Sequence, residues 1–278
     1  MMWKDLPTPC YVVDEGKIRK NPCYVIDEGK LTENLKILHH VMQRTGAKIL
    51  LAQKAFSAFC EYPLIGKYLS GTTASGLYEA RLAQEEMGKE NHVFAPAYKE
   101  KDMEELVQIC DHIIFNSFAQ FEKHKEIISA YNNSQRENGN RVSIGMRVNP
   151  EFSTQEGHAI YDPCAPGSRL GVVRAKFPET LPEEIEGLHV HTLCEQDSDD
   201  LEATFNAFEK SFEPYLKKIK WLNLGGGHHI TRPGYDIERL IRLIKRIKDT
   251  YHLEVYLEPG EAIALNAGYL ITEVQDIV

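Results

Sequence analysis

Short apolar runs of β-strand type alternate with amphipathic stretches along most of the chain. The runs, eight in number, are KILLAQK (48–54), TTASG (72–76), HVFAPAY (92–98), HIIFNS (112–117), RVSIGMRVN (141–149), GLHVHTL (187–193), WLNLGGG (221–227) and EVYLEPG (254–260). Apolar character of this kind is typical of parallel strands that are covered by helices. The pattern therefore predicts an α/β protein with a parallel sheet.

The stretches between these runs carry apolar positions at helical spacing. They include LYEARLAQEEMG (77–88), KDMEELVQIC (101–110), FAQFEKHKEIISAY (118–131), LEATFNAFEKSFEPYLKK (201–218) and IERLIRLIKRIKDTY (237–251). Eight strand–helix units of this size match a (β/α)8 TIM barrel, which we expect over residues 32–265. An open doubly wound sheet is the alternative, but its usual GxGxxG fingerprint after a first strand is absent.

The amino-terminal segment, residues 1–31, contains a short repeat. PCYVVDEGK (9–17) recurs as PCYVIDEGK (22–30), an offset of 13 residues. Because solenoids need several longer repeats, we interpret this pair as a local duplication or a gene-model artefact. The second copy runs directly into an amphipathic helix, LTENLKILHHVMQRTG (31–46), and we expect this copy to be integrated in the fold.

Composition and charge narrow the class of partner. The chain has 278 residues and a net charge of -9, and no Lys/Arg stripe offsets the acidic balance. This argues against nucleic-acid binding and favours a small-molecule partner. There is no signal-peptide pattern and no long apolar run, so we expect a cytoplasmic protein without membrane contact. The six cysteines are scattered without a CxxC pair, and we interpret most of them as buried small hydrophobes.

Reactive residues collect at the ends of the predicted strands, where a (β/α)8 barrel builds its active site. They are Lys54, Ser75, Arg147, Asn149, His189, His191, Gly225, Gly226, Gly227 and Glu258. Lys54 follows the apolar run ILLAQ, and partial burial at the barrel mouth would lower its pKa, as a lysine that forms a Schiff base requires. The alternative for Lys54 is an ion-paired lysine.

The glycines and histidines at the strand ends each allow two interpretations. Gly225–Gly227 can present backbone N–H groups to a phosphate, or form only a tight turn. His189 and His191 share one face of a strand, which suits either a metal pair or one imidazole lying against a planar cofactor. His228 and His229 could supply further metal ligands, so a metal-dependent hydrolase is an alternative function. Because lysine and glycines occupy the neighbouring strand ends instead of further ligands, we expect no metal.

Glu258 lies in the sequence EPGEA, where proline and glycine fix a turn at the barrel mouth. A carboxylate there could pair with the ring nitrogen of pyridoxal 5'-phosphate (PLP) and keep it protonated. A helix-capping or ion-paired glutamate is the alternative. A lysine, a glycine loop, a histidine and this carboxylate together form a more specific set than any one of them alone.

These residues resemble the alanine-racemase-fold (fold type III) PLP decarboxylases that act on ornithine, arginine and diaminopimelate. The resemblance covers nearly the whole chain from Pro22 onward and is greatest for the branch that decarboxylates carboxynorspermidine and carboxyspermidine. The motifs that carry it are PCYVIDEGKL, LLAQKAFS, TASGLYEARLA, YDPCAPGSRLG, GLHVHTLCE, LNLGGGHHIT and EPGEA. It implies a PLP-dependent carboxy-lyase of polyamine biosynthesis that yields norspermidine or spermidine.

The resemblance also implies a role for each matching residue. Lys54 would carry PLP, His191 would stack on the pyridine ring, and Glu258 would contact the ring nitrogen. Gly225–Gly227 would bind the phosphate, and Arg147 would support the lysine side of the site. Arg169 and Glu195 are weaker candidates near the substrate.

Two departures from the diaminopimelate branch bear on the substrate. That branch tends to have His-Ile-Gly-Ser-Gln and Glu-Pro-Gly-Arg, where this chain has His191-Thr-Leu-Cys-Glu195 and Glu258-Pro-Gly-Glu261. The added acidic groups favour a polycationic substrate, a carboxylated polyamine. Decarboxylation of diaminopimelate or a related amino acid is the alternative reaction.

Members of this family continue into a β-domain that also takes up the first strand of the chain. Residues 266–278, which include YLITEVQDIV, look like the start of that domain, so we expect the domain to be largely missing from this chain. The β-domain implies a homodimer and supplies a cysteine to the partner's active site. On this interpretation the proton donor lies beyond Val278, and a truncated, non-catalytic homologue is a further alternative.

Overall fold

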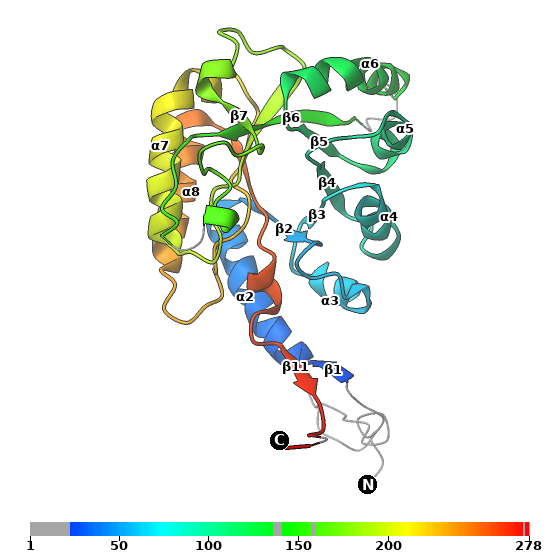
Figure 1. Ribbon diagram of the computed structural model, residues 1–278, viewed down its shortest axis with the longest axis vertical. Coiled ribbons are helices and arrows are strands. Elements are labelled where there is room, and N and C mark those ends of the chain that lie inside the picture. The colour runs from blue at the N-terminus through cyan, green and yellow to red at the C-terminus, as the bar shows by residue number, and fades with distance from the viewer. Residues whose placement is uncertain (1–22, 136–140, 157–158, 275, 278) are drawn as a thin grey trace.

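Eight parallel strands close into a barrel in this computed structural model, which describes residues 23–135, 141–156, 159–274 and 276–277. The barrel strands are β2 (Lys48–Ala52), β3 (Gly71–Ala74), β4 (Glu90–Phe94), β5 (His112–Phe115), β6 (Ser143–Asn149), β8 (Ile185–Val190), β9 (Trp221–Asn223) and β10 (Glu254–Leu257). Each pairs with the next in this order, and β10 pairs with β2 to close the ring (Figure 1). The predicted (β/α)8 barrel is confirmed.

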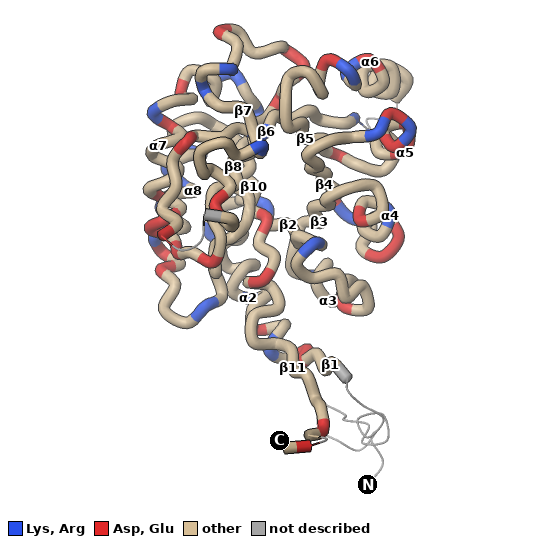
Figure 2. Tube along the Cα trace, viewed as in Figure 1, with Lys and Arg blue, Asp and Glu red and all other residues tan. Residues whose placement is uncertain are grey.

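Helices cover the outside of the ring (Figure 1). They are α2 (Glu28–Thr45), α3 (Tyr62–Ile65), α4 (Leu77–Glu86), α5 (Glu100–Ile109), α6 (Phe118–Ser134), α7 (Ser198–Leu216), α8 (Ile237–Tyr251) and α9 (Glu261–Ala264). Acidic and basic positions both occur on α5, α6 and α7 (Figure 2). None of the helices in the described ranges is long and apolar enough to cross a membrane.

The connection from β6 to β8 is the one that departs from the strand–helix alternation. Over its described residues it contains a short strand, β7 (Val172–Val173), which pairs with β6 outside the ring. It also contains two 3-10 turns, η3 (Ala159–Tyr161) and η4 (Arg174–Lys176). A further 3-10 turn, η2 (Phe59–Glu61), follows β2. The long β6–β8 connection lies beside the carboxyl end of the barrel.

Helix α2 shows why the second copy of the repeat is part of the fold. The Asp27 side chain caps the helix by accepting a hydrogen bond from the Lys30 N–H at 3.0 Å. The helix ends at Gly46, which adopts a left-handed conformation with φ of 65°. Both signals stand in the sequence at the ends of the predicted helix. The first copy, residues 9–17, lies outside the described residues.

Strand β1 (Cys23–Ile26) pairs antiparallel with β11 (Gly268–Ile271), so the two ends of the described chain form a separate two-stranded ribbon. The ribbon extends beyond α2, away from the ring of strands (Figure 1). Helix α2 crosses residue 31, and the division of the chain into 1–31, 32–265 and 266–278 stays a prediction.

Alternation along the strands creates two apolar layers. Side chains such as Ile49, Leu51 and Val255 face outward and pack against the helices in the larger core. Their neighbours in sequence face inward and form a second, smaller cluster inside the barrel, made of Leu50, Ile114, Trp221 and Tyr256. The inner cluster separates the two ends of the barrel.

Trp221 fits inside the barrel because its neighbours are glycines. A Cβ on Gly187 would lie 2.0 Å from the indole, and one on Gly145 would lie 2.3 Å from it. The indole N–H donates to the Ser143 hydroxyl at 2.9 Å, which fixes the orientation of the ring. Strands β6 and β8 therefore carry glycine where the largest side chain of the barrel interior lies.

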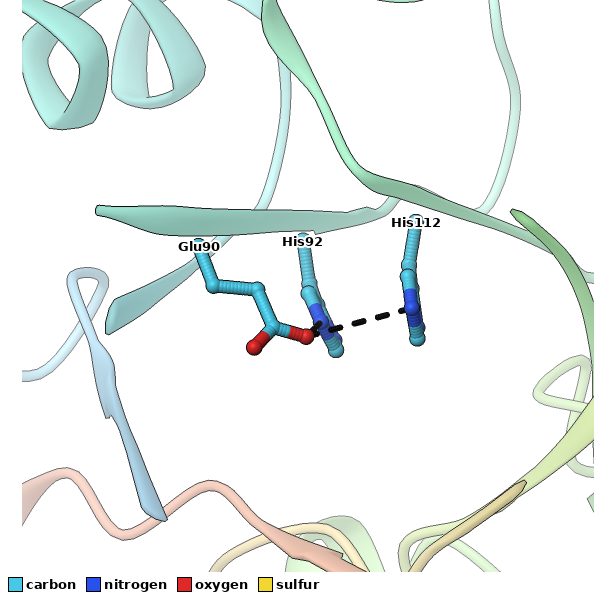
Figure 3. A group of neighbouring side chains, drawn as sticks. All are labelled: Glu90, His92 and His112. Atoms are coloured by element: carbon cyan, nitrogen blue, oxygen red, sulfur yellow. Dashed lines mark hydrogen bonds and ion pairs between the residues drawn. The ribbon is translucent and has the colours of Figure 1, made fainter. Parts of the chain in front are cut away.

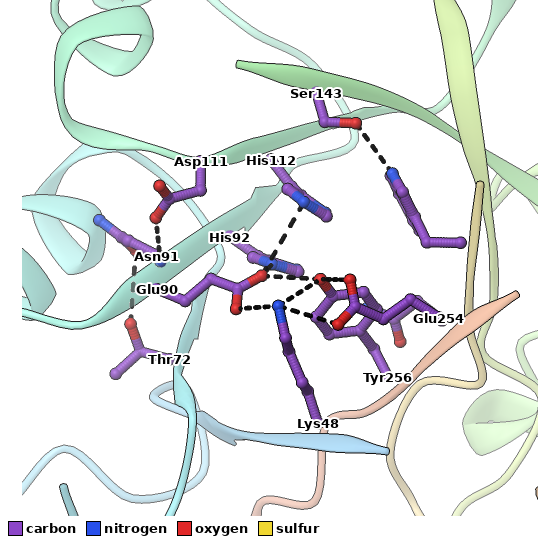
Figure 4. Close-up of polar contacts among 12 residues, drawn as sticks. Lys48, Thr72, Glu90, Asn91, His92, Asp111, His112, Ser143, Glu254 and Tyr256 are labelled. Carbon is purple, nitrogen blue, oxygen red and sulfur yellow. Dashed lines mark hydrogen bonds and ion pairs between the residues drawn. The ribbon is translucent and has the colours of Figure 1, made fainter. Parts of the chain in front are cut away.

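The amino end of the barrel is filled by a polar cluster instead of aliphatic side chains (Figure 4). Lys48, Glu90 and Glu254 lie at the starts of β2, β4 and β10, and they contact one another and Tyr256. His92 and His112 stack beside them. This cluster was not predicted from the sequence.

The four cysteines with described side chains only partly match their interpretation as buried hydrophobes. Cys110 is buried, Cys164 and Cys194 are half-buried, and Cys60 is exposed. The interpretation is therefore correct for Cys110 and wrong for Cys60, which lies in the exposed turn η2 after β2.

Gly187→Ala should destabilise the barrel, because its new Cβ overlaps the buried Trp221 ring. We expect a loss of about 1–3 kcal/mol in the free energy of unfolding, the usual cost of overpacking a core. Urea denaturation followed by circular dichroism measures it. Gly76→Ala is the control, since no atom lies within 4 Å of the added Cβ. Equal stability of the two variants would contradict the packing described for Trp221.

Candidate active site

Two adjoining cavities open at the carboxyl ends of the barrel strands. Their volumes are about 40 Å³ and about 280 Å³. Both are lined by Ala52, Lys54, Arg147, His191 and Glu258. The structure therefore brings together the lysine, arginine, histidine and glutamate that the sequence analysis selected from strands β2, β6, β8 and β10.

Lys54 lies in the turn that follows β2, two residues past the end of the strand. The turn is held by hydrogen bonds from the Gln53 N–H to the Thr73 carbonyl at 3.2 Å and from the Ala55 N–H to the Ala52 carbonyl at 3.1 Å. Lys54 is exposed at the barrel mouth, so the predicted partial burial of this lysine is wrong. The strand ends earlier than expected, which places Lys54 at the rim of the mouth between the two cavities.

Glu258 is a buried carboxylate directly after β10. The Asn223 amide donates to its Oε1 at 2.7 Å, and His189 Nε2 lies 3.2 Å from its Oε2. Burial raises the pKa of Glu258, but His189 and the Asn223 hydrogen bond lower it more, so the pKa falls below its usual value. Glu258 is therefore ionised at neutral pH.

His191 lies just after β8, against the glycine loop. Its Nδ1 accepts a hydrogen bond from the Gly226 N–H at 3.4 Å, and its carbonyl accepts one from Arg147 at 3.3 Å. Burial and the nearby cations Arg147 and Lys54 lower the pKa of His191 well below its usual value. A neutral imidazole therefore faces the cavities. His191 was expected within the strand, but β8 ends one residue earlier at Val190.

Arg147 is a buried cation on β6, with only 5% of its surface exposed. Burial lowers the pKa of Arg147 to about 10, so the guanidinium stays protonated at neutral pH. Its Cζ lies 4.7 Å from the centre of the Phe94 ring, at cation–π distance. Arg147 thus connects the His191 backbone with the aromatic wall of the smaller cavity.

The three glycines after β9 form a loop that other residues could not form. Gly225 and Gly227 have φ of 69° and 84°. A Cβ on Gly226 would lie 2.1 Å from the Glu258 carbonyl oxygen, and one on Gly227 would lie 2.0 Å from the Leu193 carbonyl oxygen. Backbone therefore approaches backbone closely on both sides of the loop. Gly227 lines the larger cavity, where its main chain can face an anion.

The larger cavity has an acidic side. Glu195 and Glu261 line it, and His229 Nε2 lies 3.3 Å from Glu261 Oε2. Glu195 has a φ of 57°, a conformation that a non-glycine residue rarely adopts. Glu195 is exposed where it lines the larger cavity.

Arg169 lies apart from the other candidates. It lines two outer cavities but neither of those at the strand ends, and its carbonyl accepts a hydrogen bond from the Asn116 amide at 2.9 Å. Ser75 does line the smaller cavity. The Asn149 side chain accepts a hydrogen bond from the Glu151 N–H at 2.8 Å and so shapes the turn after β6.

Asn223 and Phe94 were missed by the sequence analysis. Asn223 is fully buried, and besides binding Glu258 its side chain accepts a hydrogen bond from the Gly225 N–H at 2.8 Å. Its position two residues before the glycines was a usable signal, because a buried strand seldom carries an amide without a partner. Nothing in the run HVFAPAY distinguishes Phe94 from the other apolar residues of a buried strand.

A metal ion at the barrel mouth would be bound by His189, His191 and Glu258, whose ligand atoms lie within 4.8 Å of one another. Two cations, Lys54 and Arg147, are close enough to lower the pKa of both histidines. One carboxylate facing two fixed cations is a poor environment for a divalent ion. His228 lines the larger cavity, but its Nδ1 lies 3.2 Å from the Tyr235 hydroxyl and it does not belong to this group of ligand atoms among the described residues.

Comparison with known proteins identifies relatives that match nearly the whole chain. A carboxynorspermidine/carboxyspermidine decarboxylase from Campylobacter jejuni is 42% identical over 278 residues, which are 100% of this chain and 66% of the relative. One from Herminiimonas arsenicoxydans is 35% identical over 98% of this chain and 68% of the relative. A carboxyaminopropylagmatine decarboxylase from Synechocystis is 40% identical over 98% of this chain and 65% of the relative. The chain spans about two thirds of the length of these relatives. No protein-family model matches it.

Solved structures show the same fold. Carboxynorspermidine decarboxylase from Campylobacter jejuni, in complex with norspermidine, superposes with a TM-score of 0.82 at 41% identity, over 93% of this chain and 65% of that one. The protein called SrLDC, in complex with PLP and cadaverine, has a TM-score of 0.61 at 14% identity, over 94% of this chain and 67% of that one. At that identity the second likeness concerns the fold alone.

Glu258→Gln tests the electrostatics of this site. Because the folded-state pKa of Glu258 is lowered, its ionised form contributes stability that is complete above the ordinary pKa of 4.5 and is lost as the pH falls further. We expect wild type to be more stable than Glu258→Gln at pH 7 and the difference to shrink below about pH 4.5. Urea denaturation at several pH values measures it. A difference that grows toward acid pH would show that Glu258 is not held as a carboxylate.

Proposed function

The chain belongs to the family of carboxynorspermidine/carboxyspermidine decarboxylases, and from this premise we propose that it removes the carboxylate of a carboxylated polyamine with PLP as cofactor. Carboxynorspermidine and carboxyspermidine are the proposed substrates, and norspermidine and spermidine are the products. The observation that carries the proposal is the convergence of Lys54, His191, Glu258 and the glycine loop on adjoining cavities. The reaction class is that of a carboxy-lyase.

The residues at the barrel mouth fit PLP. Gly225–Gly227 form a cradle that a Cβ would fill, which suits a phosphate held by backbone N–H groups. Buried nitrogens of His189 lack a well-aligned hydrogen-bond partner in the described structure, so polar groups at the site remain to be satisfied. When bound, PLP supplies an electron sink for the electrons released as the carboxylate leaves Cα.

Lys54 would hold the cofactor through its amino group, and the other residues would position the ring. The neutral imidazole of His191 would lie against the face of the ring, where a charged imidazole would add a positive charge. The ionised Glu258 would accept a hydrogen bond from the ring nitrogen and keep a proton on it. Arg147 would support His191 by its hydrogen bond to the His191 carbonyl.

The acidic side of the larger cavity supports a polycationic substrate. Glu195 and Glu261 could accept hydrogen bonds from the distal ammonium groups of a carboxylated polyamine, and Lys54 lines the same cavity. Arg169, which lines two outer cavities, stays a weaker candidate near the substrate. The names of the three relatives all specify the decarboxylation of a carboxylated polyamine or agmatine derivative.

We also propose that the active protein is a cytoplasmic homodimer that binds neither nucleic acid nor membranes. The ribbon of β1 and β11 supports a second, β-rich domain, because it joins the two ends of the described chain in a sheet separate from the barrel. Such a domain would place further residues, including a proton donor, near the barrel mouth of the partner.

Lys54→Ala should abolish covalent PLP binding. The PLP-loaded chain is expected to show a visible absorption band from the cofactor bound to the lysine, and this band should be absent in the variant. Absorption spectroscopy after desalting measures it. Lys67→Ala, which removes an exposed lysine outside the cavities, is the control and should keep the band. An unchanged band in Lys54→Ala would exclude Lys54 as the PLP-binding residue.

The substrate assignment predicts release of CO2 from carboxyspermidine and carboxynorspermidine in preference to diaminopimelate. Glu261→Gln should raise KM for carboxyspermidine by about tenfold, the effect of losing one charge-assisted hydrogen bond. The same change should leave KM for diaminopimelate nearly unchanged. The control is Glu179→Gln, which alters an exposed glutamate outside the cavities. A preference for diaminopimelate would contradict the substrate class, whereas an unchanged KM in Glu261→Gln would contradict only the role of Glu261.

A further inference from the structure

A second group of metal-ligating side chains lies at the amino end of the barrel, opposite the mouth. Glu90 and His92 are two residues apart on β4 and therefore face the same side of the strand. His112 on β5 is the register partner of His92 in the parallel pair. All three side chains extend into the barrel (Figure 3).

The distances within this group suit one small ion. His92 Nε2 lies 2.9 Å and His112 Nε2 lies 3.9 Å from Glu90 Oε1, and all ligand atoms lie within 4.8 Å of one another. Four ligands at about 2.0–2.2 Å around a tetrahedral ion are separated by roughly 3.4 Å. The observed distances bracket that separation. Two imidazoles and a carboxylate are a ligand set that zinc prefers.

The group already holds a cation, the ammonium of Lys48. Lys48 Nζ lies 2.9 Å from Glu90 Oε2 and 3.0 Å from Glu254 Oε1, and it donates to the Tyr256 hydroxyl at 3.2 Å (Figure 4). Three oxygens from β4 and β10 thus converge on one positive charge. The Lys48 side chain is 34% exposed, so it can withdraw to solvent when another cation takes its place.

The balance of charge distinguishes this end of the barrel from the mouth. At the amino end, Glu90 and Glu254 face the single cation Lys48. At the mouth, Glu258 faces both Lys54 and the buried Arg147. The two histidines and the glutamate at the amino end therefore lie beside one further carboxylate and one cation, whereas the corresponding set at the mouth lies beside two cations. Coulomb attraction favours a divalent ion at the amino end.

At least one of the two imidazoles must reorient to share an ion. Their rings now stack at 3.9 Å with an angle of 17° between the planes, whereas a shared ion must lie near the plane of both rings. The Nδ1 atoms of His92 and His112 are buried and make no hydrogen bond in the described structure. Nothing therefore fixes the rings through Nδ1, but His112 also stacks on Trp221 with ring centroids 4.7 Å apart, so binding of an ion would require His112 to turn about its Cβ–Cγ bond away from this stack.

We propose that Glu90, His92 and His112 form a binding site for a divalent transition-metal ion, zinc above all, and that Lys48 competes with the ion for this site. Glu254 and Tyr256 lie within reach as further oxygen ligands. The ion would join β4 to β5 and, through Glu254, to β10 at the amino end of the barrel. This site does not depend on the proposed reaction at the mouth, which lies on the other side of the inner apolar cluster.

Zinc titration of the tag-free chain, followed by calorimetry, tests the proposal. We expect one high-affinity zinc ion per chain and a higher Tm in its presence. His112→Gln should weaken zinc binding by more than about a hundredfold, since even the loss of a residue that only supports a metal ligand costs up to that factor. Cobalt in place of zinc should give the visible absorption of a four-coordinate site in wild type and not in His112→Gln.

A second variant keeps the proposal testable if His112→Gln does not fold. Lys48→Met removes the competing cation and should tighten zinc binding by about tenfold or more, a gain that misfolding cannot produce. Lys220→Met is the matched control, because Lys220 lies at the same end of the barrel but pairs with Glu186. Zinc affinity that is equal in wild type and His112→Gln, or equal in Lys48→Met and Lys220→Met, would overturn the proposal. Loss of zinc binding in His189→Gln alone would assign the ion to the mouth and also overturn it.

Discussion

The pairing of β10 with β2 is the interaction on which the rest of the structure depends. Tyr256 and Leu257 pair with Lys48 and Ile49, so the last barrel strand lies beside the first. In parallel strands all carboxyl ends point the same way, and closure turns these ends into one ring. Glu258 and Lys54, which are far apart in the sequence, become neighbours around the same cavities for this reason. An open sheet would leave them at opposite edges.

Closure also gives the barrel two chemically different ends. Trp221 and its inward-facing neighbours fill the middle, and the glycines of β6 and β8 make room for the indole. On one side of this layer, two cations and a glycine loop suit a phosphorylated, planar cofactor. On the other side, carboxylates and imidazoles surround a single ammonium. Apolar packing in the middle thus keeps two polar sites apart within one small barrel.

The order of strands and helices in the barrel could be predicted from the sequence. Each barrel strand is buried on both faces, so it appears in the sequence as a nearly continuous apolar run. The eight strands begin within about two residues of their predicted starts, but most end earlier than predicted. The predicted runs LLAQK and LNLGGG continue past the last strand residue, because the turn at the barrel mouth follows the apolar residues without a break in the sequence pattern. For that reason Lys54 and His191 lie beyond their strands, and Lys54 is exposed where burial was expected.

The polar cluster at the amino end could not be predicted in the same way. Lys48, Glu90 and Glu254 each look like an ordinary charged residue at the start of a strand. Only the register of four strands shows that they share one space, and register is not visible in a single sequence. The role of Asn223 could not be predicted for the same reason, because its side chain donates a hydrogen bond to Glu258, which follows the neighbouring strand.

The central claim is that Lys54 is the residue that holds PLP. Borohydride reduction of the PLP-loaded chain, followed by digestion and peptide mass mapping, tests it without any assay of activity. We expect one phosphopyridoxyl group per chain, on the peptide that contains Lys54. A group found on another lysine, or no covalent group after reduction, would contradict it.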